Sequence, residues 1–179
     1  MIRRVGQTPT GVRTNFLRQN GEQAGFDSLG KTRILGPVVT TKETRVFAVE
    51  DSPVFVSAIE EMLSGIPGVS MTGSAAEAGL AVQEIQRLAP DVIILDLHLK
   101  TGTGMDVLRA VRRGAATPPV SIVFSSCLDE SCRKFCRRHG ADFIVDKSEN
   151  YSQLVEVIRS IAKGLDDGQF PGRSWPAEN

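Results

Sequence analysis

The sequence predicts an α/β fold in which five β/α units, (βα)5, form one parallel sheet covered by helices on both faces, a doubly wound three-layer sandwich. Three observations predict it. Short β-rich runs recur five times after residue 44. The segments between them repeat apolar residues at helical spacing. The runs are largely apolar rather than alternating, which is typical of strands buried on both faces of a parallel sheet.

The strands are expected at residues 45–50, 69–73, 92–96, 120–125 and 142–146. The apolar repeats that predict helices include Val56, Ile59, Met62 and Leu63, then Ala78, Val82, Ile85 and Leu88, and finally Leu154, Ile158, Ile161 and Leu165. Because strands that alternate with helices are joined by right-handed crossovers, all five strands are expected to run parallel.

A chain of 179 residues, 41% of them hydrophobic, is long enough for one such domain with some chain left over. Residues 44–164 are expected to form this domain. Residues 1–43 hold no apolar period and are expected to be a mostly disordered leader. Residues 165–179 are expected to be a short irregular tail. The leader is basic, since residues 1–44 carry seven basic and three acidic side chains.

Charge balance, hydropathy and cysteine content together favour an ordinary soluble protein. Lys+Arg and Asp+Glu are both 21, so nothing indicates a nucleic-acid partner. No apolar stretch approaches the ~18 residues that cross a bilayer, and no secretory signal is evident. The three cysteines lie close together and suit reduced thiols. These observations predict a cytoplasmic protein without membrane contact.

Polar side chains stand where the predicted strands end. Glu50 and Asp51 follow the first strand, Asp96 ends the third, Ser125 ends the fourth, and Lys147 follows the fifth. Because the carboxyl ends of parallel strands meet at one edge of the sheet, these groups are expected to converge. Three carboxylates so close together are unfavourable unless a cation or the lysine compensates their charge, and oxygen ligands favour Mg²⁺. The sequence therefore predicts a magnesium site.

These residues, in this order, resemble the receiver domain of two-component response regulators, over residues 44–164. The resemblance implies a flavodoxin-like fold with the strand order 2-1-3-4-5. It implies that "VEDS" supplies Asp51 as a direct Mg²⁺ ligand and Glu50 as a group that acts on the ion through water. It further implies that "LDLHL" supplies Asp96 as phosphoacceptor and metal ligand, with the backbone carbonyl of His98 as another ligand.

The same resemblance implies roles for two more residues. Ser125 in "VFSSC" matches the hydroxyl that binds a phosphoryl oxygen, and Lys147 in "IVDKS" matches the invariant lysine. The implied function is to accept a phosphoryl group from a histidine kinase or a histidine phosphotransfer protein. Because one helix and a short tail follow Lys147, the expectation is a stand-alone receiver without a DNA-binding output domain. It would signal by protein contact, as a monomer or weak homodimer, and catalyse no reaction beyond its own phosphorylation and dephosphorylation.

Several positions depart from the family pattern. Lys100 stands where a proline usually stiffens the loop after the phosphoacceptor. Ile144 stands where an aromatic residue usually swings inward on activation, and Phe143 beside it is expected to face the other way. His98 and Cys127 occupy positions that tune dephosphorylation in this family, which predicts an atypical phosphoryl lifetime.

Two alternatives remain at this point. One is a phosphate-independent interaction module with the receiver fold. The other is a redox or metal sensor that uses Cys127, Cys132 and Cys136, with His139 three residues further on. Cys132, Phe135 and Cys136 also form an apolar stripe with which their helix could dock, and this core-packing interpretation is favoured.

Overall fold

The chain divides into two compact units, Met1–Thr41 and Lys42–Asn179. In this computed structural model, the described residues are 16–17, 22–26 and 32–37 of the first unit, and 43–114, 116–126, 128–148 and 151–166 of the second. Among these described residues, no helix combines the length and the apolar character needed to span a membrane.

The first unit contains a small antiparallel sheet. Its strands are β1 (Phe16–Leu17), β2 (Glu22–Phe26) and β3 (Thr32–Pro37), in the order β1-β2-β3. The mostly disordered leader expected at residues 1–43 stays a prediction, and within that range the structure describes these three short strands. Strands of two to six residues are too short to carry a detectable apolar period, and antiparallel pairing supplies their backbone partners locally. The leader's other residues before 43 lie outside the described ranges.

The second unit contains a five-stranded parallel sheet and five helices. Its elements in chain order are β4 (Thr44–Val49), α1 (Pro53–Ser64), β5 (Val69–Ala75), α2 (Ala78–Leu88), β6 (Val92–Leu95), α3 (Gly104–Gly114), β7 (Val120–Ser125), α4 (Glu130–Arg138), β8 (Phe143–Asp146) and α5 (Tyr151–Asp166). The strand order is β5-β4-β6-β7-β8, which confirms the expected order 2-1-3-4-5. The strands begin and end within two residues of their predicted positions. Helix α5 continues to residue 166, past the expected domain end at 164.

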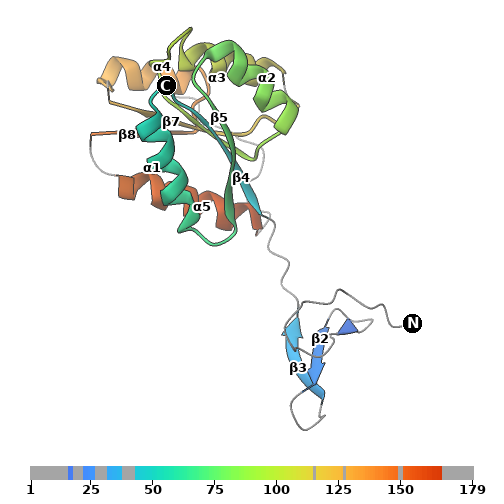
Figure 1. Ribbon diagram of the computed structural model, residues 1–179. Helices are drawn as coiled ribbons and strands as arrows, with labels where there is room; N and C mark the ends of the chain where they lie inside the picture. Colours follow the sequence, from blue (N-terminus) through green and yellow to red (C-terminus); the bar gives the residue numbers. More distant parts are fainter. Residues whose placement is uncertain are drawn as a thin grey trace. The chain divides into compact units, whose positions relative to one another are not determined.

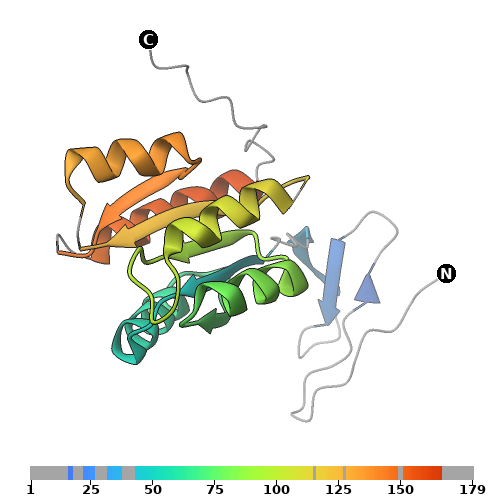
Figure 2. The ribbon, with the colours of Figure 1, turned by 90° about the horizontal axis from the view of Figure 1, so that it is seen from above.

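The helices form two layers around the sheet. Figure 1 shows α1 and α5 below it and α2, α3 and α4 above it, and Figure 2 shows the upper layer from above. Successive side chains of β4 divide between these layers, since Phe47 and Val49 pack toward α2–α4 whereas Val46 and Ala48 pack toward α1 and α5. Because both faces are covered, both sets of side chains must be apolar, as predicted.

The last strand and last helix follow their predicted patterns. Ile144 packs with the α2–α4 layer and Phe143 with the α1–α5 layer, so the two side chains face opposite ways as expected. In α5, the predicted apolar stripe is fully buried at Leu154, Ile158 and Ile161. The side chain of Leu165 lies outside the described part.

The apolar contacts of helix α4 with the core come from its cysteines. Cys136 is fully buried, and Cys132 packs against the same core cluster. Phe135 is 43% exposed, so its predicted place in the docking stripe is wrong. A helix advances by about 100° per residue, and the narrow contact made by Cys132 and Cys136 leaves Phe135 at its margin. The Phe135 ring packs instead beside His139 and under the Arg109 guanidinium.

Helix α3 is held at both ends. At its start, the backbone N–H of Gly104 donates to the Leu97 carbonyl (3.2 Å), which folds the intervening loop back onto the end of β6. At its other end, Arg112 forms a 2.5 Å ion pair with Asp142 and donates to the Ser121 hydroxyl (2.7 Å). These contacts fix α3 against the strands that flank it.

Gly104 closely approaches the backbone of Asp96, the residue that follows β6, and this contact gives a stability prediction. A Cβ at Gly104 would overlap the carbonyl oxygen of Asp96, so Gly104→Ala should lower the free energy of unfolding by roughly 1–3 kcal/mol or more. Urea denaturation measures this. The matched control is Gly79→Ala in α2, where no atom lies within 4 Å of an added Cβ; it should raise stability by up to about 1 kcal/mol. Equal stability of the two variants would contradict the steric argument.

Candidate functional site

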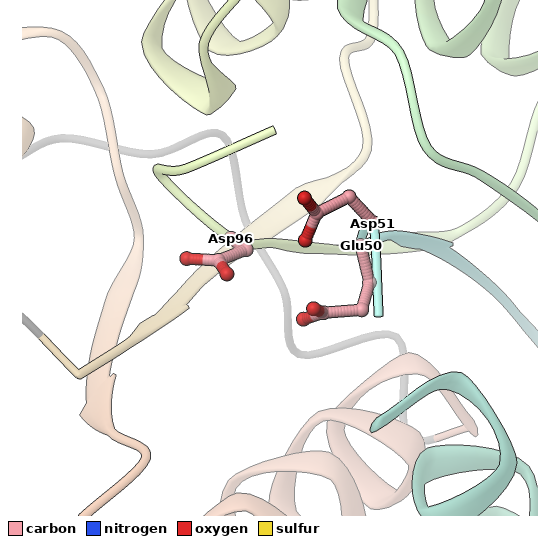
Figure 3. Close-up of side chains that lie close together, drawn as sticks. All are labelled: Glu50, Asp51 and Asp96. Carbon is pink, nitrogen blue, oxygen red and sulfur yellow. The ribbon is translucent and has the colours of Figure 1, made fainter. Parts of the chain in front are cut away.

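The predicted acidic residues meet at the carboxyl edge of the sheet. Glu50 and Asp51 follow β4, and Asp96 follows β6, the strand that pairs with β4. Figure 3 shows their three carboxylates gathered close together. Each residue offers one ligand oxygen, and these oxygens all lie within 4.8 Å of one another. Within the part of the chain that the structure describes, no other group of three or more His, Cys, Asp or Glu residues is arranged to hold a metal ion.

The three carboxylates differ in exposure. Glu50 is 4% exposed and Asp96 is 8% exposed, whereas Asp51 is open to solvent. Burial raises the pKa of Glu50, and the hydrogen bond and charge of Lys147 and the Ser52 N–H (3.2 Å) lower it only in part. The protein therefore compensates the charge of this cluster incompletely.

Lys147 joins the two buried carboxylates. Its Nζ lies 2.5 Å from Oε2 of Glu50 and 2.6 Å from Oδ2 of Asp96, and its side chain is 4% exposed. The residue follows β8, and its backbone N–H donates to the Ser125 carbonyl (3.1 Å). From this position the side chain reaches across β7 to the acids of β4 and β6.

Ser125 carries an unsatisfied hydroxyl at the same carboxyl edge of the sheet. It is the last residue of β7 and is fully buried, and its Oγ has no hydrogen-bond partner among the described residues. A buried polar group without a partner costs about 1–3 kcal/mol. Such an atom is typical of a site where a bound group supplies the missing partner.

The loop after Asp96 is fixed by backbone hydrogen bonds. The His98 N–H donates to Oδ1 of Asp96 (3.3 Å), and the Lys100 N–H donates to the Ala76 carbonyl (3.2 Å). The N–H of Ala78 donates in return to the carbonyl of residue 101 (2.9 Å). A proline at position 100 would have no N–H to donate, so the hydrogen bond from residue 100 to the β5–α2 loop could not form with the family's usual residue there.

The donor set fits Mg²⁺. Three carboxylates and one ammonium leave two negative charges uncompensated, which a divalent cation would balance. All the ligand atoms are oxygens, and Mg²⁺ is usually held by one or two carboxylates with water completing its shell. Receiver domains generally bind Mg²⁺ through an acidic pocket of this kind.

The cysteines do not form a second site in the described residues. Burial, followed by the neighbouring Cys132, raises the pKa of the Cys136 thiol to about 12, so this residue is not a thiolate at neutral pH. Nδ1 of His139 lies 2.8 Å from the Phe135 carbonyl oxygen, within its own helical turn. Cys127 lies outside the described residues. The redox or metal-sensor alternative gains no support from Cys132 and Cys136.

Three aromatic side chains around Lys147 were not predicted from the sequence. The Lys147 Nζ lies 4.5 Å from the ring centroid of Phe55 and 5.6 Å from that of Phe124, and Tyr151 packs against both rings. The one available signal was spacing, because Phe55 stands four residues after Asp51 and Tyr151 four after Lys147. A spacing of four is common at the start of any helix, so it does not by itself indicate a contact with the lysine.

Comparison with known proteins agrees with this fold. The profile of the response regulator receiver domain matches residues 46–159. The chain belongs to this family, and the predicted resemblance is confirmed. It is a receiver domain of two-component signalling, a class of domain that histidine kinases or phosphotransfer proteins phosphorylate.

Individual relatives show what the similarity covers. The nitrate/nitrite response regulator protein NarP of Escherichia coli (strain K12) is 34% identical over 121 residues, 67% of this chain and 55% of that protein. A protein-glutamate methylesterase/protein-glutamine glutaminase of Alkalilimnicola ehrlichii is 29% identical over 149 residues, 76% of this chain and 38% of that protein. The chain thus spans about half or less of these relatives. Their names indicate different outputs, so the receiver region does not define one.

A solved structure confirms the fold. The signal receiver domain of the response regulator NarL from Mycobacterium tuberculosis superposes with a TM-score of 0.63 at 25% identity. The match covers 69% of this chain and 98% of that domain. The doubly wound, flavodoxin-like architecture predicted from the sequence is therefore shared with a known receiver.

The acidic cluster predicts a stability response to Mg²⁺. At ten times its Kd, the ion should stabilise the fold by about 1.4 kcal/mol, which corresponds to a rise in Tm of roughly 3–6 °C. Asp51→Asn should abolish the response because it removes the exposed carboxylate of the cluster. Differential scanning calorimetry in the presence and absence of MgCl2 measures it. Glu60→Gln, on the exposed surface of α1, should respond as the wild type does; loss of response there too would point to a general salt effect.

Proposed function

We propose that this chain accepts a phosphoryl group on Asp96 from a histidine kinase or a histidine phosphotransfer protein, and that it signals by protein contact. The observation that carries the proposal is the ion pair between Lys147 and Asp96 beside two further acids at the carboxyl edge of the sheet. Asp51, Asp96 and the backbone carbonyl of His98 would hold Mg²⁺, and Glu50 would act on it through water.

Asp96 is the nucleophile in this proposal. A bond forms between one of its carboxylate oxygens and phosphorus as the P–N bond of the donor phosphohistidine breaks, and the electron pair leaves on the imidazole nitrogen. The Mg²⁺ ion, when bound, neutralises charge on the transferring phosphoryl oxygens. The hydrogen bond from the His98 N–H to Oδ1 restricts the rotation of the Asp96 carboxylate before the reaction.

Lys147 and Ser125 supply the protein's own charge stabilisation. The Lys147 ammonium already lies beside Asp96 and can follow the negative charge from the carboxylate to the phosphoryl oxygens. The buried Ser125 hydroxyl, which lacks a partner, can donate to one of these oxygens. The Lys147 ammonium lies beside Asp96 before the reaction, so this charge needs little reorganisation during transfer.

The product changes the charge at the strand ends. An acyl phosphate carries about 1.5 to 2 negative charges where the carboxylate carried one. Ser125 ends β7 and Lys147 follows β8, and these strands precede α4 and α5 in the chain. Contacts of Ser125 and Lys147 with the new oxygens would therefore shift the relative energies of arrangements of the α4–β8–α5 region. That region would present the phosphorylation state to a protein partner.

Phosphorylation by a small phosphodonor tests the proposal. With Mg²⁺ and acetyl phosphate, the wild type should gain the mass of one phosphoryl group, and Asp96→Asn should gain none. Ser125→Ala should be phosphorylated roughly 10- to 100-fold more slowly because it removes one oxyanion donor. It should also be more stable by about 1 kcal/mol, because an unsatisfied buried hydroxyl is gone.

Intact-mass spectrometry over time follows the phosphorylation, and urea denaturation follows the stability. Glu60→Gln serves as the control and should be phosphorylated as the wild type is. A wild type that never gains the phosphoryl mass, or an Asp96→Asn variant that gains it, would refute the assignment. The first result would instead favour a phosphate-independent interaction module.

A further inference from the structure

The Lys147 ammonium lies against an aromatic wall built from three elements. Phe55 comes from α1, Phe124 from β7 and Tyr151 from the first turn of α5. The Nζ atom lies 4.5 Å from the Phe55 centroid and 5.6 Å from the Phe124 centroid, both within the range of cation–π attraction. Tyr151 supports both rings: its centroid is 6.5 Å from Phe55 in a stacked arrangement and 5.5 Å from Phe124 edge-on.

This aromatic wall bears on a competition between the Lys147 ammonium and a divalent cation for the same carboxylates. The ammonium now has Glu50 and Asp96 as its partners, at 2.5 and 2.6 Å. A divalent cation bound by the same acidic cluster would compete for these carboxylates and repel the ammonium. Since lysine has a long flexible stem, the side chain could turn away from Asp96 when the ion binds. Phosphoryl transfer, however, needs both the divalent cation and the Lys147 ammonium beside Asp96.

Aromatic faces hold an ammonium without adding negative charge. A further carboxylate near Lys147 would also retain it, but it would add a fourth negative charge beside three acids whose ligand atoms already lie within 4.8 Å of one another. The face of a phenyl ring attracts the ammonium through its quadrupole and binds no Mg²⁺ through oxygen. Lys147 is 4% exposed, so solvent screens this attraction little.

We propose that Phe55 and Tyr151 are positioning residues for phosphoryl transfer. Phe55 retains the Lys147 ammonium beside Asp96 when a divalent cation occupies the acidic cluster, and Tyr151 holds the Phe55 ring in place. The inference rests on the proposed function of Asp96. Phe124 contributes to the same wall, but it is fully buried in the core and its removal would report mainly on folding.

Variants at two positions separate positioning from packing. Phe55→Leu removes the ring from a half-buried position, and 3,4,5-trifluorophenylalanine at position 55 keeps the ring's shape but weakens its quadrupole. Tyr151→Leu removes the ring that supports Phe55, whereas Tyr151→Phe keeps that ring and should retain the wild-type behaviour. Phe135→Leu, on the exposed side of α4 and in contact with Arg109 and not Lys147, is the matched control.

Two measurements follow each variant in saturating Mg²⁺. NMR records the ε-methylene protons of Lys147, which ring currents from the aromatic faces move upfield. Mass spectrometry records the rate of phosphorylation by acetyl phosphate. Phe55→Leu should return the methylene signals toward those of an exposed lysine and slow phosphorylation roughly three- to tenfold. The trifluorinated protein should keep the wild-type Tm and also be slower, and Tyr151→Leu should resemble Phe55→Leu.

Tyr151→Phe and Phe135→Leu should behave as the wild type does in both measurements. The inference is overturned if the wild-type methylene signals lose their upfield shift when Mg²⁺ is added, or if the trifluorinated protein is phosphorylated as fast as the wild type. The NMR result stands independently of phosphorylation. A wild type that accepts no phosphoryl group would defeat the proposed function, while the methylene signals would still decide whether the rings hold the ammonium.

Discussion

The ion pairs of Lys147 with Glu50 and Asp96 are the interaction on which the site depends. A parallel sheet brings the carboxyl ends of its strands to one edge, and here that edge receives three acids within 4.8 Å of one another. Two of these acids are buried, and burial raises the pKa of Glu50 even though the Lys147 ammonium beside it lowers that pKa. The edge is therefore suited to gain a cation and then a phosphoryl group, both of which change its charge.

The rest of the domain holds this unfavourable arrangement in place. Asp96 follows a fully buried strand, and the chain beyond it is folded back so tightly that α3 begins directly against the Asp96 backbone at Gly104. Backbone hydrogen bonds between the loops after β5 and β6 hold the same turn, including the bond from Lys100 to Ala76. Rigid surroundings matter because catalysis by fixed charges requires that the charges do not relax away from the reacting atoms.

Within its family, the chain combines a familiar acidic site with altered surroundings. Backbone hydrogen bonds stabilise a loop that lacks its usual proline, and the aromatic contacts to Lys147 come from Phe55 and Phe124, which Tyr151 supports, rather than from position 144. Ile144 packs into the α2–α4 layer, away from the α1–α5 layer in which Phe124 and Tyr151 pack. The rings beside Lys147 therefore connect this lysine to the first turn of α5.

The amino-acid sequence by itself determined the strands, their parallel arrangement and the polar residues at their ends. Apolar runs and helical spacing are local properties, and the parallel sheet then dictates that Glu50, Asp51, Asp96, Ser125 and Lys147 meet. Only the tertiary structure decided which oxygens Lys147 bonds, across 97 residues of chain, and which rings surround it. It also decided that Phe135 is exposed and that residues 16–17, 22–26 and 32–37 form short strands. These features depend on packing and pairing between segments whose own patterns are too short or too ambiguous to specify their partners.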